Sequence, residues 1–191
     1  VSFALSVYCS NSIRLKFPSV PLIDVVLFLI YNRKIDIFLG MSNKDKIIVA
    51  LDFESCDKAL ALVESLDGYA NFFKIGLGLI GRGGLELAYE LKKRGLHVFL
   101  DLKLFDISNT IKNAVSGLCE SKFDFLTVQG DPQVIKAAVE GRGTSITKIL
   151  AVTFLTSLNR KDLDQNLIIP GEIQTLVCSR AEKAILAGAD G

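Results

Sequence analysis

Short apolar runs that alternate with amphipathic stretches are the feature that most constrains the fold of this chain. Five runs have the length of buried strands, and they cover residues 47–52, 72–76, 97–101, 123–128 and 148–153. The stretches between them repeat apolar residues at helical spacing, and residues 172–187 form one more helical pattern after the fifth run. Regular alternation of strands and helices predicts a parallel sheet with right-handed crossovers, in either a doubly wound sheet or a β/α barrel.

Charged residues at the carboxyl ends of three successive runs decide between these two folds. Asp52 ends the first run, Lys74 lies near the end of the second, and Asp101 and Lys103 close the third. Barrel enzymes assemble their sites at this face from several strands. A dinucleotide-binding sheet would carry a glycine-rich loop after its first strand, and residues 51–55 contain no glycine. We therefore predict a TIM (β/α)8 barrel, incomplete because the chain holds only about five β/α units.

Chemistry is expected above all in residues 98–110, where a strand meets the following helix. Asp101 and Lys103 are two residues apart, so in a regular strand they project from the same face, and Asp106 follows closely. The Ser-Asn-Thr sequence of residues 108–110 is typical of a helix start. Burying charged groups at the end of a buried strand costs desolvation free energy unless the groups are paired. The spacing is therefore compatible with a structural ion pair and with an active site.

Glycines and capping residues predict where the helices begin and end. Ser55 is a candidate cap for a helix that ends near Gly68, and the next helix stops at Gly95. We interpret the glycines that precede that second helix as helix boundaries rather than as a phosphate-binding loop; they are Gly81, Gly83 and Gly84. His97 begins the third run, away from the charged end, and we interpret it as structural.

Composition narrows the class of protein. The chain has 191 residues, half of them hydrophobic, which predicts one domain with a substantial core. Its 22 lysines and arginines nearly balance 21 aspartates and glutamates, so overall charge favours neither nucleic acid nor a membrane surface. The four cysteines are far apart and there is a single histidine, which leaves no zinc set. We interpret Cys9, Cys56, Cys119 and Cys178 as reduced thiols of a cytoplasmic protein, and we expect the last three, which lie in helical stretches, to be unreactive.

Residues 1–40 differ from the rest of the sequence. Two prolines precede an apolar run over residues 25–31, and no helical stripe is evident. Asp24 stands immediately before this run and basic residues follow it, which argues against a signal peptide, and the run is too short to span a membrane. Because Met41 is the only methionine, we expect the natural protein to begin there, with residues 1–40 as translated upstream sequence or a disordered leader. An anchor or targeting segment is the alternative; residues 41–191 form the partial barrel.

Five motifs together resemble the bacterial orotidine 5′-phosphate decarboxylase family. They are Ile48-Val49-Ala50-Leu51-Asp52, Phe73-Lys74-Ile75-Gly76, Phe99-Leu100-Asp101-Leu102-Lys103, Asp106-Ile107-x-Asn109-Thr110 and Leu150-Ala151-Val152-Thr153-x-Leu155-Thr156-Ser157. The resemblance runs in order from Met41 to Gly191. The Asp-x-Lys-x-x-Asp pattern alone also occurs in related sugar-phosphate decarboxylases and synthases, whereas Asn109-Thr110 and the later Leu-Thr-Ser favour the orotidine enzyme.

The resemblance implies a carbon–carbon lyase that makes UMP for pyrimidine biosynthesis with no cofactor and no metal. Lys103 resembles the ammonium that stabilises negative charge at C6 of the pyrimidine and then donates a proton. Asp101 would face the carboxylate of the substrate, so that repulsion is relieved as carbon dioxide leaves. Lys74 and Asp106 would complete an alternating chain of charges around the lysine.

The same resemblance implies substrate contacts and a second subunit. Asp52 resembles the residue that binds the ribose hydroxyls, and Thr156 resembles the side chain that touches the pyrimidine amide. Asp106 and Thr110 would reach into the site of the neighbouring subunit, which implies a homodimer.

The sequence also departs from the family pattern. Phe105 and Gln129 stand where many bacterial members have histidine, and Ser108 stands where they have proline. The family's strands six to eight, whose loops grip the substrate phosphate, have no counterpart in these residues, so we expect this fragment alone to show little turnover. Two other hypotheses stay open: a related sugar-phosphate decarboxylase or synthase, many of which need magnesium, and a non-catalytic remnant or binding module.

Overall fold

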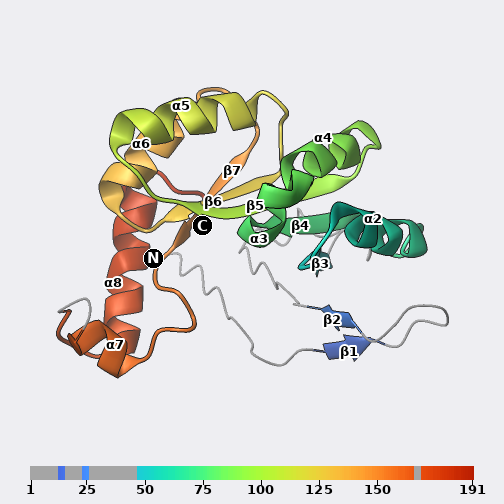
Figure 1. Ribbon diagram of the computed structural model, residues 1–191. Coiled ribbons are helices and arrows are strands. Elements are labelled where there is room, and N and C mark those ends of the chain that lie inside the picture. Colours follow the sequence, from blue (N-terminus) through green and yellow to red (C-terminus); the bar gives the residue numbers. More distant parts are fainter. Residues whose placement is uncertain (1–12, 16–22, 26–46, 166–168) are drawn as a thin grey trace, which may run out of the picture. The chain divides into compact units, whose positions relative to one another are not determined.

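The computed structural model describes residues 13–15, 23–25, 47–165 and 169–191. The chain divides into two compact units, Val1–Asp101 and Leu102–Gly191. Five parallel strands follow one another in the sheet in the order of the sequence, β3-β4-β5-β6-β7 (Figure 1). A doubly wound sheet reverses its strand order at a switch point, so this monotonic order is that of a barrel. Among the described residues, no helix is both long and apolar enough for a membrane span.

The first unit contains three strands of this sheet and the helices between them. Its elements are β3 (Ile48–Ala50), α2 (Cys56–Ser65), β4 (Phe72–Gly76), α3 (Leu77–Leu79), η2 (Ile80–Gly84), α4 (Leu85–Lys93) and the first residues of β5 (His97–Leu104). Strand β4 pairs with β3 from Ile48↔Phe72 to Ala50↔Lys74, and with β5 from Phe72↔His97 to Gly76↔Asp101. These two ladders place the carboxyl ends of three strands side by side.

Local chemistry explains most of the helix boundaries in this unit. The Ser55 hydroxyl accepts a hydrogen bond from the Lys58 N–H at 3.4 Å, so Ser55 is the predicted cap of α2. The prediction that this helix ends near Gly68 was wrong by a few residues, because α2 ends at Ser65 and Gly68 lies in the following turn with φ +76°. Helix α4 ends at Lys93, just before Gly95, as the sequence predicted.

The segment before α4 contains structure that the sequence did not predict. The three residues of α3 lead into a π-helical turn, η2, in which Arg82 and Gly83 depart from helical geometry. Gly83 has a φ of +91°, which an L side chain rarely adopts, so glycine is required at this kink.

The N-terminal region is described only at residues 13–15 and 23–25. These residues form β1 (Ile13–Leu15) and β2 (Ile23–Val25), which pair in antiparallel fashion. The remainder of the proposed leader, together with Met41, lies outside the described residues.

The second unit continues the β/α alternation. Its elements after β5 are α5 (Ser108–Cys119), β6 (Phe125–Gln129), α6 (Pro132–Arg142), β7 (Lys148–Val152), α7 (Arg160–Gln165) and α8 (Ile173–Leu186). Helices α5 and α6 lie side by side (Figure 1). Strand β7 pairs with β6 from Phe125↔Lys148 to Gln129↔Val152. Buried residues of β6, α6 and β7 form the core; among them are Leu126, Val128, Ile135, Ala138 and Ile149.

Several boundaries in this unit differ from the sequence prediction. Strand β5 extends to Leu104 instead of ending at Asp101, and β6 begins at Phe125 instead of 123. Helix α5 begins at Ser108, but its cap position is Ile107, which offers no side-chain hydrogen bond. Helix α7 was not predicted from the sequence.

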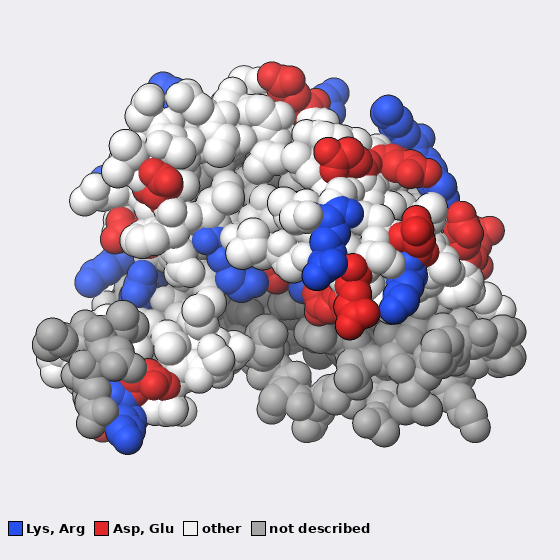
Figure 2. Space-filling model, viewed as in Figure 1, with Lys and Arg blue, Asp and Glu red and all other residues white. Residues whose placement is uncertain are grey.

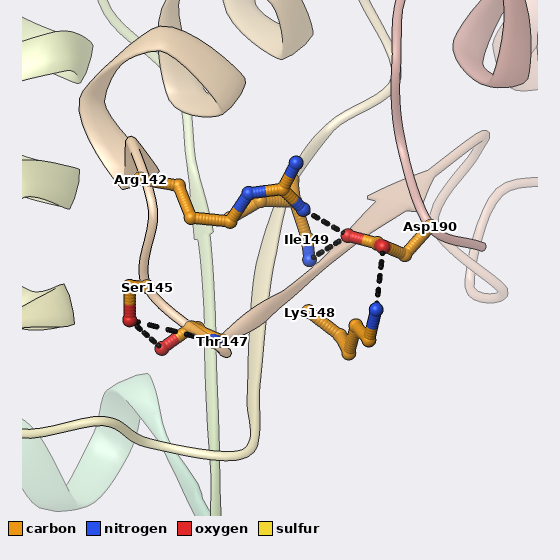
Figure 3. A network of polar contacts seen from close by, with 6 residues as sticks. All are labelled: Arg142, Ser145, Thr147, Lys148, Ile149 and Asp190. Carbon is orange, nitrogen blue, oxygen red and sulfur yellow. Dashed lines mark hydrogen bonds and ion pairs between the residues drawn. The ribbon is translucent and has the colours of Figure 1, made fainter.

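Residues 188–191 follow α8, and the last two of them bond to the backbone of β7, as the sequence predicted for a turn toward another strand. The Asp190 N–H donates to the Ile149 carbonyl at 2.9 Å, and the Ala151 N–H donates to the Gly191 carbonyl at 2.8 Å. The Asp190 carboxylate accepts from the Ile149 N–H at 2.9 Å and pairs with Arg142 and, at 3.1 Å, with Lys148 (Figure 3). We call these three side chains the Asp190 cluster.

Candidate active site

Three of the predicted site residues meet in the first unit. The Lys74 Nζ lies 3.3 Å from Asp101 Oδ2 and 3.5 Å from Asp52 Oδ1. Asp52 lies in the loop after β3, Lys74 lies near the end of β4, and Asp101 lies in β5 opposite the last residue of β4, so the parallel register brings the three together. We call this group the Lys74 cluster.

Burial within the Lys74 cluster is uneven. The side chains of Lys74 and Asp101 are 9% and 13% exposed, whereas that of Asp52 is 67% exposed. A nearly buried ammonium is costly unless carboxylates surround it, and here two of them do. One ammonium and two carboxylates give the cluster a formal net charge of −1. The Asp52 carboxylate is the part of the cluster that solvent reaches.

Lys103 lies in the second unit, near the end of β5, with an unusual backbone. Its φ is +50°, in the left-handed region that lysine seldom adopts. Its N–H donates to the hydroxyl of Thr127 at 2.9 Å, and Thr127 is only 5% exposed. Such strain is characteristic of functional sites. The prediction that Asp101 and Lys103 share a face assumed a regular strand, and the backbone is not regular at Lys103.

The other predicted site residues of the second unit are exposed and lie on separate elements. Asp106 is in the loop before α5, where its Oδ1 accepts a hydrogen bond from the Ile107 N–H at 2.7 Å. Thr110 is in the first turn of α5, and Thr156 is in the loop after β7. Their side chains are therefore available to a ligand or another subunit.

Two residues that shape these sites were not predicted from the sequence. Thr127 was counted only as part of an apolar strand, although a hydroxyl within Phe-Leu-Thr-Val was a visible signal. Gly76 was quoted in a motif and given no role, and it lies against the Lys74 cluster.

His97 and the cysteines are in structural positions. His97 is the first residue of β5, and its ring lies 5.4 Å from that of Phe72. Cys56, Cys119 and Cys178 are free thiols within α2, α5 and α8, as predicted, and Cys9 is outside the described residues. Burial raises the pKa of the Cys56 and Cys119 thiols, which lowers their reactivity.

Metal-ligand groups and surface charge were also compared across the described residues. They contain no group of three or more histidine, cysteine, aspartate or glutamate side chains that could hold a metal ion. On the face that Figure 2 shows, acidic and basic side chains are interspersed.

Comparison with known proteins decides the family. The sequence model of the "Orotidine 5'-phosphate decarboxylase / HUMPS family" matches residues 45–191. The chain belongs to this family. Orotidine 5′-phosphate decarboxylase of Ruegeria pomeroyi is 55% identical over 152 residues, which are 79% of this chain and 63% of the relative. That of Jannaschia sp. is 56% identical over 150 residues, which are 78% of this chain and 66% of the relative.

Two solved structures support the fold. Orotidine 5′-phosphate decarboxylase from Lactobacillus acidophilus is 34% identical with a TM-score of 0.68, over 75% of this chain and 68% of that one. An uncharacterized conserved protein from Geobacillus kaustophilus is 35% identical with a TM-score of 0.70, over 75% and 71%. The predicted membership of the TIM-barrel decarboxylase family is thus confirmed. The chain spans a little under two thirds of the curated relatives that it matches.

Proposed function

We propose that the protein containing these residues decarboxylates orotidine 5′-phosphate to UMP without a cofactor. The observation that carries this proposal is the nearly buried Lys74 ammonium between Asp52 and Asp101 at successive strand ends, in a chain of this family. A cation with two carboxylates at this face provides the preorganised charges that a reaction developing negative charge on carbon needs.

Lys103 carries the chemical step in this proposal. The bond between C6 and the carboxylate carbon breaks, carbon dioxide leaves, and the electron pair stays on C6. The Lys103 ammonium stabilises that pair and donates a proton to C6. Asp101 repels the substrate carboxylate until it departs, and Lys74 and Asp106 complete the chain of charges. The hydrogen bond from Lys103 N–H to Thr127 supports this role because it holds the strained backbone of the lysine.

Replacing Lys103 tests the reaction. In the natural protein expressed from its gene, Lys103→Ala should lower UMP formation from orotidine 5′-phosphate by about a thousandfold or more, since the proton donor and the stabilising charge are lost together. Lys122→Ala is the matched control, because Lys122 also has a positive φ, +52°, but lies exposed in the turn after α5. A fully active Lys103→Ala protein would refute the assignment.

A related sugar-phosphate decarboxylase or synthase is the second candidate, because the family model also covers HUMPS proteins. Many such enzymes need magnesium. Decarboxylation of the orotidine nucleotide that persists in excess chelator would favour the first candidate. A protein that binds UMP but turns over neither class of substrate would support the binding-module hypothesis.

We also propose a homodimer, in which Asp106 and Thr110 contribute to the site of the partner subunit. Both are exposed, and Asp106 lies between two large apolar side chains, Phe105 and Ile107, which are 70% and 73% exposed. Exposed apolar groups of this size favour burial against another protein surface.

Subunit mixing tests this arrangement. Lys103→Ala and Asp106→Ala should each be nearly inactive, whereas a denatured and refolded equal mixture should recover about a quarter of wild-type activity. In a mixed dimer, one site combines the intact Lys103 of one subunit with the intact Asp106 of the other. A mixture as inactive as its components would argue that Asp106 serves its own subunit.

Two smaller proposals complete this assignment. The polypeptide of residues 1–191 alone should show little turnover, because binding energy from remote substrate groups is used at the reacting carbon and the chain spans under two thirds of its relatives. Measurable UMP production by the purified polypeptide would contradict this. We place the protein in the cytoplasm, which cell fractionation can check.

A further inference from the structure

Gly76 lies where a side chain would interfere with the Lys74 cluster. A Cβ atom built on Gly76 would be 3.3 Å from Asp52 Oδ1 and 3.7 Å from Lys74 Nζ. Gly76 is two residues after Lys74 on β4 and pairs with Asp101 in the ladder, so its side-chain position faces the same side of the sheet as Lys74. The missing side chain therefore leaves open the space that the charged groups share.

Backbone conformation does not explain a glycine here. Gly76 has φ −93° and ψ 169°, an extended conformation that any residue adopts. Glycine at this position is thus explained by space, unlike Gly83, whose positive φ requires it.

A methyl group at position 76 would act mainly on Asp52. A contact of 3.3 Å is tighter than nine in ten real Cβ contacts, so a neighbour must move by a few tenths of an ångström. Lys74 is nearly buried and is held 3.3 Å from Asp101, whereas the Asp52 side chain is 67% exposed and free to rotate outward. The added carbon would therefore separate Asp52 from Lys74 and leave the Lys74–Asp101 pair in place.

We propose that Gly76 is a positioning residue: by having no side chain, it lets Lys74 hold the Asp52 carboxylate in the orientation that receives the ribose of the substrate. This inference rests on the proposed function, in which Asp52 binds ribose hydroxyls. Gly76 acts through Asp52, so its effect depends both on the ribose hydroxyls and on the Asp52 carboxylate.

Calorimetric binding of two nucleotides to the natural protein tests the ligand dependence. Gly76→Ala should weaken the affinity for UMP about tenfold, as expected for one lost interaction, and should leave the affinity for 2′,3′-dideoxyuridine 5′-monophosphate within about twofold. Gly78→Ala is the matched control, since a Cβ at Gly78 meets nothing within 4 Å, and it should bind both nucleotides as the wild type does.

A double-mutant cycle tests the route through Asp52. Asp52→Ala should itself weaken UMP binding, and adding Gly76→Ala to it should cause no further loss. Unchanged UMP affinity in Gly76→Ala, equal losses for the two nucleotides, or additive losses in the double variant would each overturn the inference. If Gly76→Ala fails to fold, restored folding in the double variant supports the inference, and continued failure overturns it.

Failure of the proposed function would look different. A wild-type protein that binds neither nucleotide would refute that function. In that case a crystal structure of Gly76→Ala would test the structural part of the inference. A longer distance between Asp52 and Lys74 than in the wild type would support it, and an unchanged distance would overturn it.

Discussion

The Lys74 cluster and the Asp190 cluster are opposite in composition. In the first, one cation of β4 pairs with two carboxylates, from β5 and from the loop after β3; in the second, one carboxylate pairs with two cations where α6 ends and β7 begins. The Asp190 side chain is 23% exposed and also accepts the N–H of Ile149 (Figure 3). These contacts hold the chain end beside β7 and the last residue of α6.

The two clusters differ in a way that distinguishes structural ion pairs from a candidate binding site. Asp190 directs both carboxylate oxygens at protein partners, whereas Asp52 is mostly exposed and lies beside a glycine that leaves space. Burial and pairing are common to both clusters. A mostly exposed carboxylate beside a glycine is found in the Lys74 cluster and not in the Asp190 cluster, and an accessible polar group is the better indicator of ligand binding.

Removing the buried cation should have the largest effect on stability. Lys74→Met should lower the free energy of unfolding by about 3 to 5 kcal/mol, because it leaves the Asp101 carboxylate nearly buried without that ammonium. Lys58→Met is the control, since Lys58 pairs with Glu54 at a similar 3.4 Å but is 64% exposed, and it should change stability by less than about 1 kcal/mol. Urea unfolding measures both, and equal midpoints would contradict the contrast.

Neutralising the carboxylate of the Asp190 cluster should have an intermediate effect. Asp190→Asn keeps the shape but loses the charge that strengthens three contacts, so we expect a loss of about 1 to 2 kcal/mol in unfolding free energy. The same change at the exposed Asp67 should be nearly neutral. The two variants are compared by urea unfolding, and an Asp190→Asn protein as stable as wild type would show that the cluster contributes nothing to stability.

Arg142 and Lys148, the two cations of the Asp190 cluster, should contribute unequally to the free energy of unfolding. Arg142 is 19% exposed and Lys148 is 57% exposed. We expect Arg142→Met to destabilise the protein by about 1 kcal/mol and Lys148→Met by under about 0.5 kcal/mol, because solvent screens the more exposed pair. Thermal unfolding at low and high salt checks this, and a larger effect at Lys148 would reverse the ranking.

The smallest expected effect concerns Cys119, a buried thiol of the second unit. Burial raises the pKa of Cys119, so the folded state keeps its proton, and stability that is present at neutral pH is lost as pH rises through this raised pKa. Iodoacetamide should accordingly label Cys119 more slowly than the exposed Cys178 and only at higher pH.

Asp190→Asn should speed labelling of Cys119. The Ser145 hydroxyl donates to the Cys119 carbonyl, and the Ser145 N–H donates to the carbonyl of Arg142, which belongs to the Asp190 cluster. Mass spectrometry of labelled peptides measures this, and equal rates in both proteins would argue against that coupling.

Several parts of the structure could be predicted from local sequence. The apolar run of residues 72–76 is β4 with the expected bounds, and Ser55 caps α2 by its own hydroxyl. The motifs that carry Asp52, Lys74 and Asp101 indicated the family, and the aligned ends of parallel strands bring those three together. These features depend on side-chain period, capping and strand direction, which act over a few residues.

Other features depend on partners distant in the sequence. The left-handed backbone of Lys103 is accompanied by a bond to Thr127, which is 24 residues away, and no local pattern announces it. Gly76 has an ordinary extended conformation, so only the placement of Asp52 and Lys74 reveals why a side chain would not fit. The sequence by itself thus determined the order of the elements, the family and the charged residues of the candidate site. The tertiary structure decided which carboxylate is open and which glycine makes room for it, because packing between strands sets those distances.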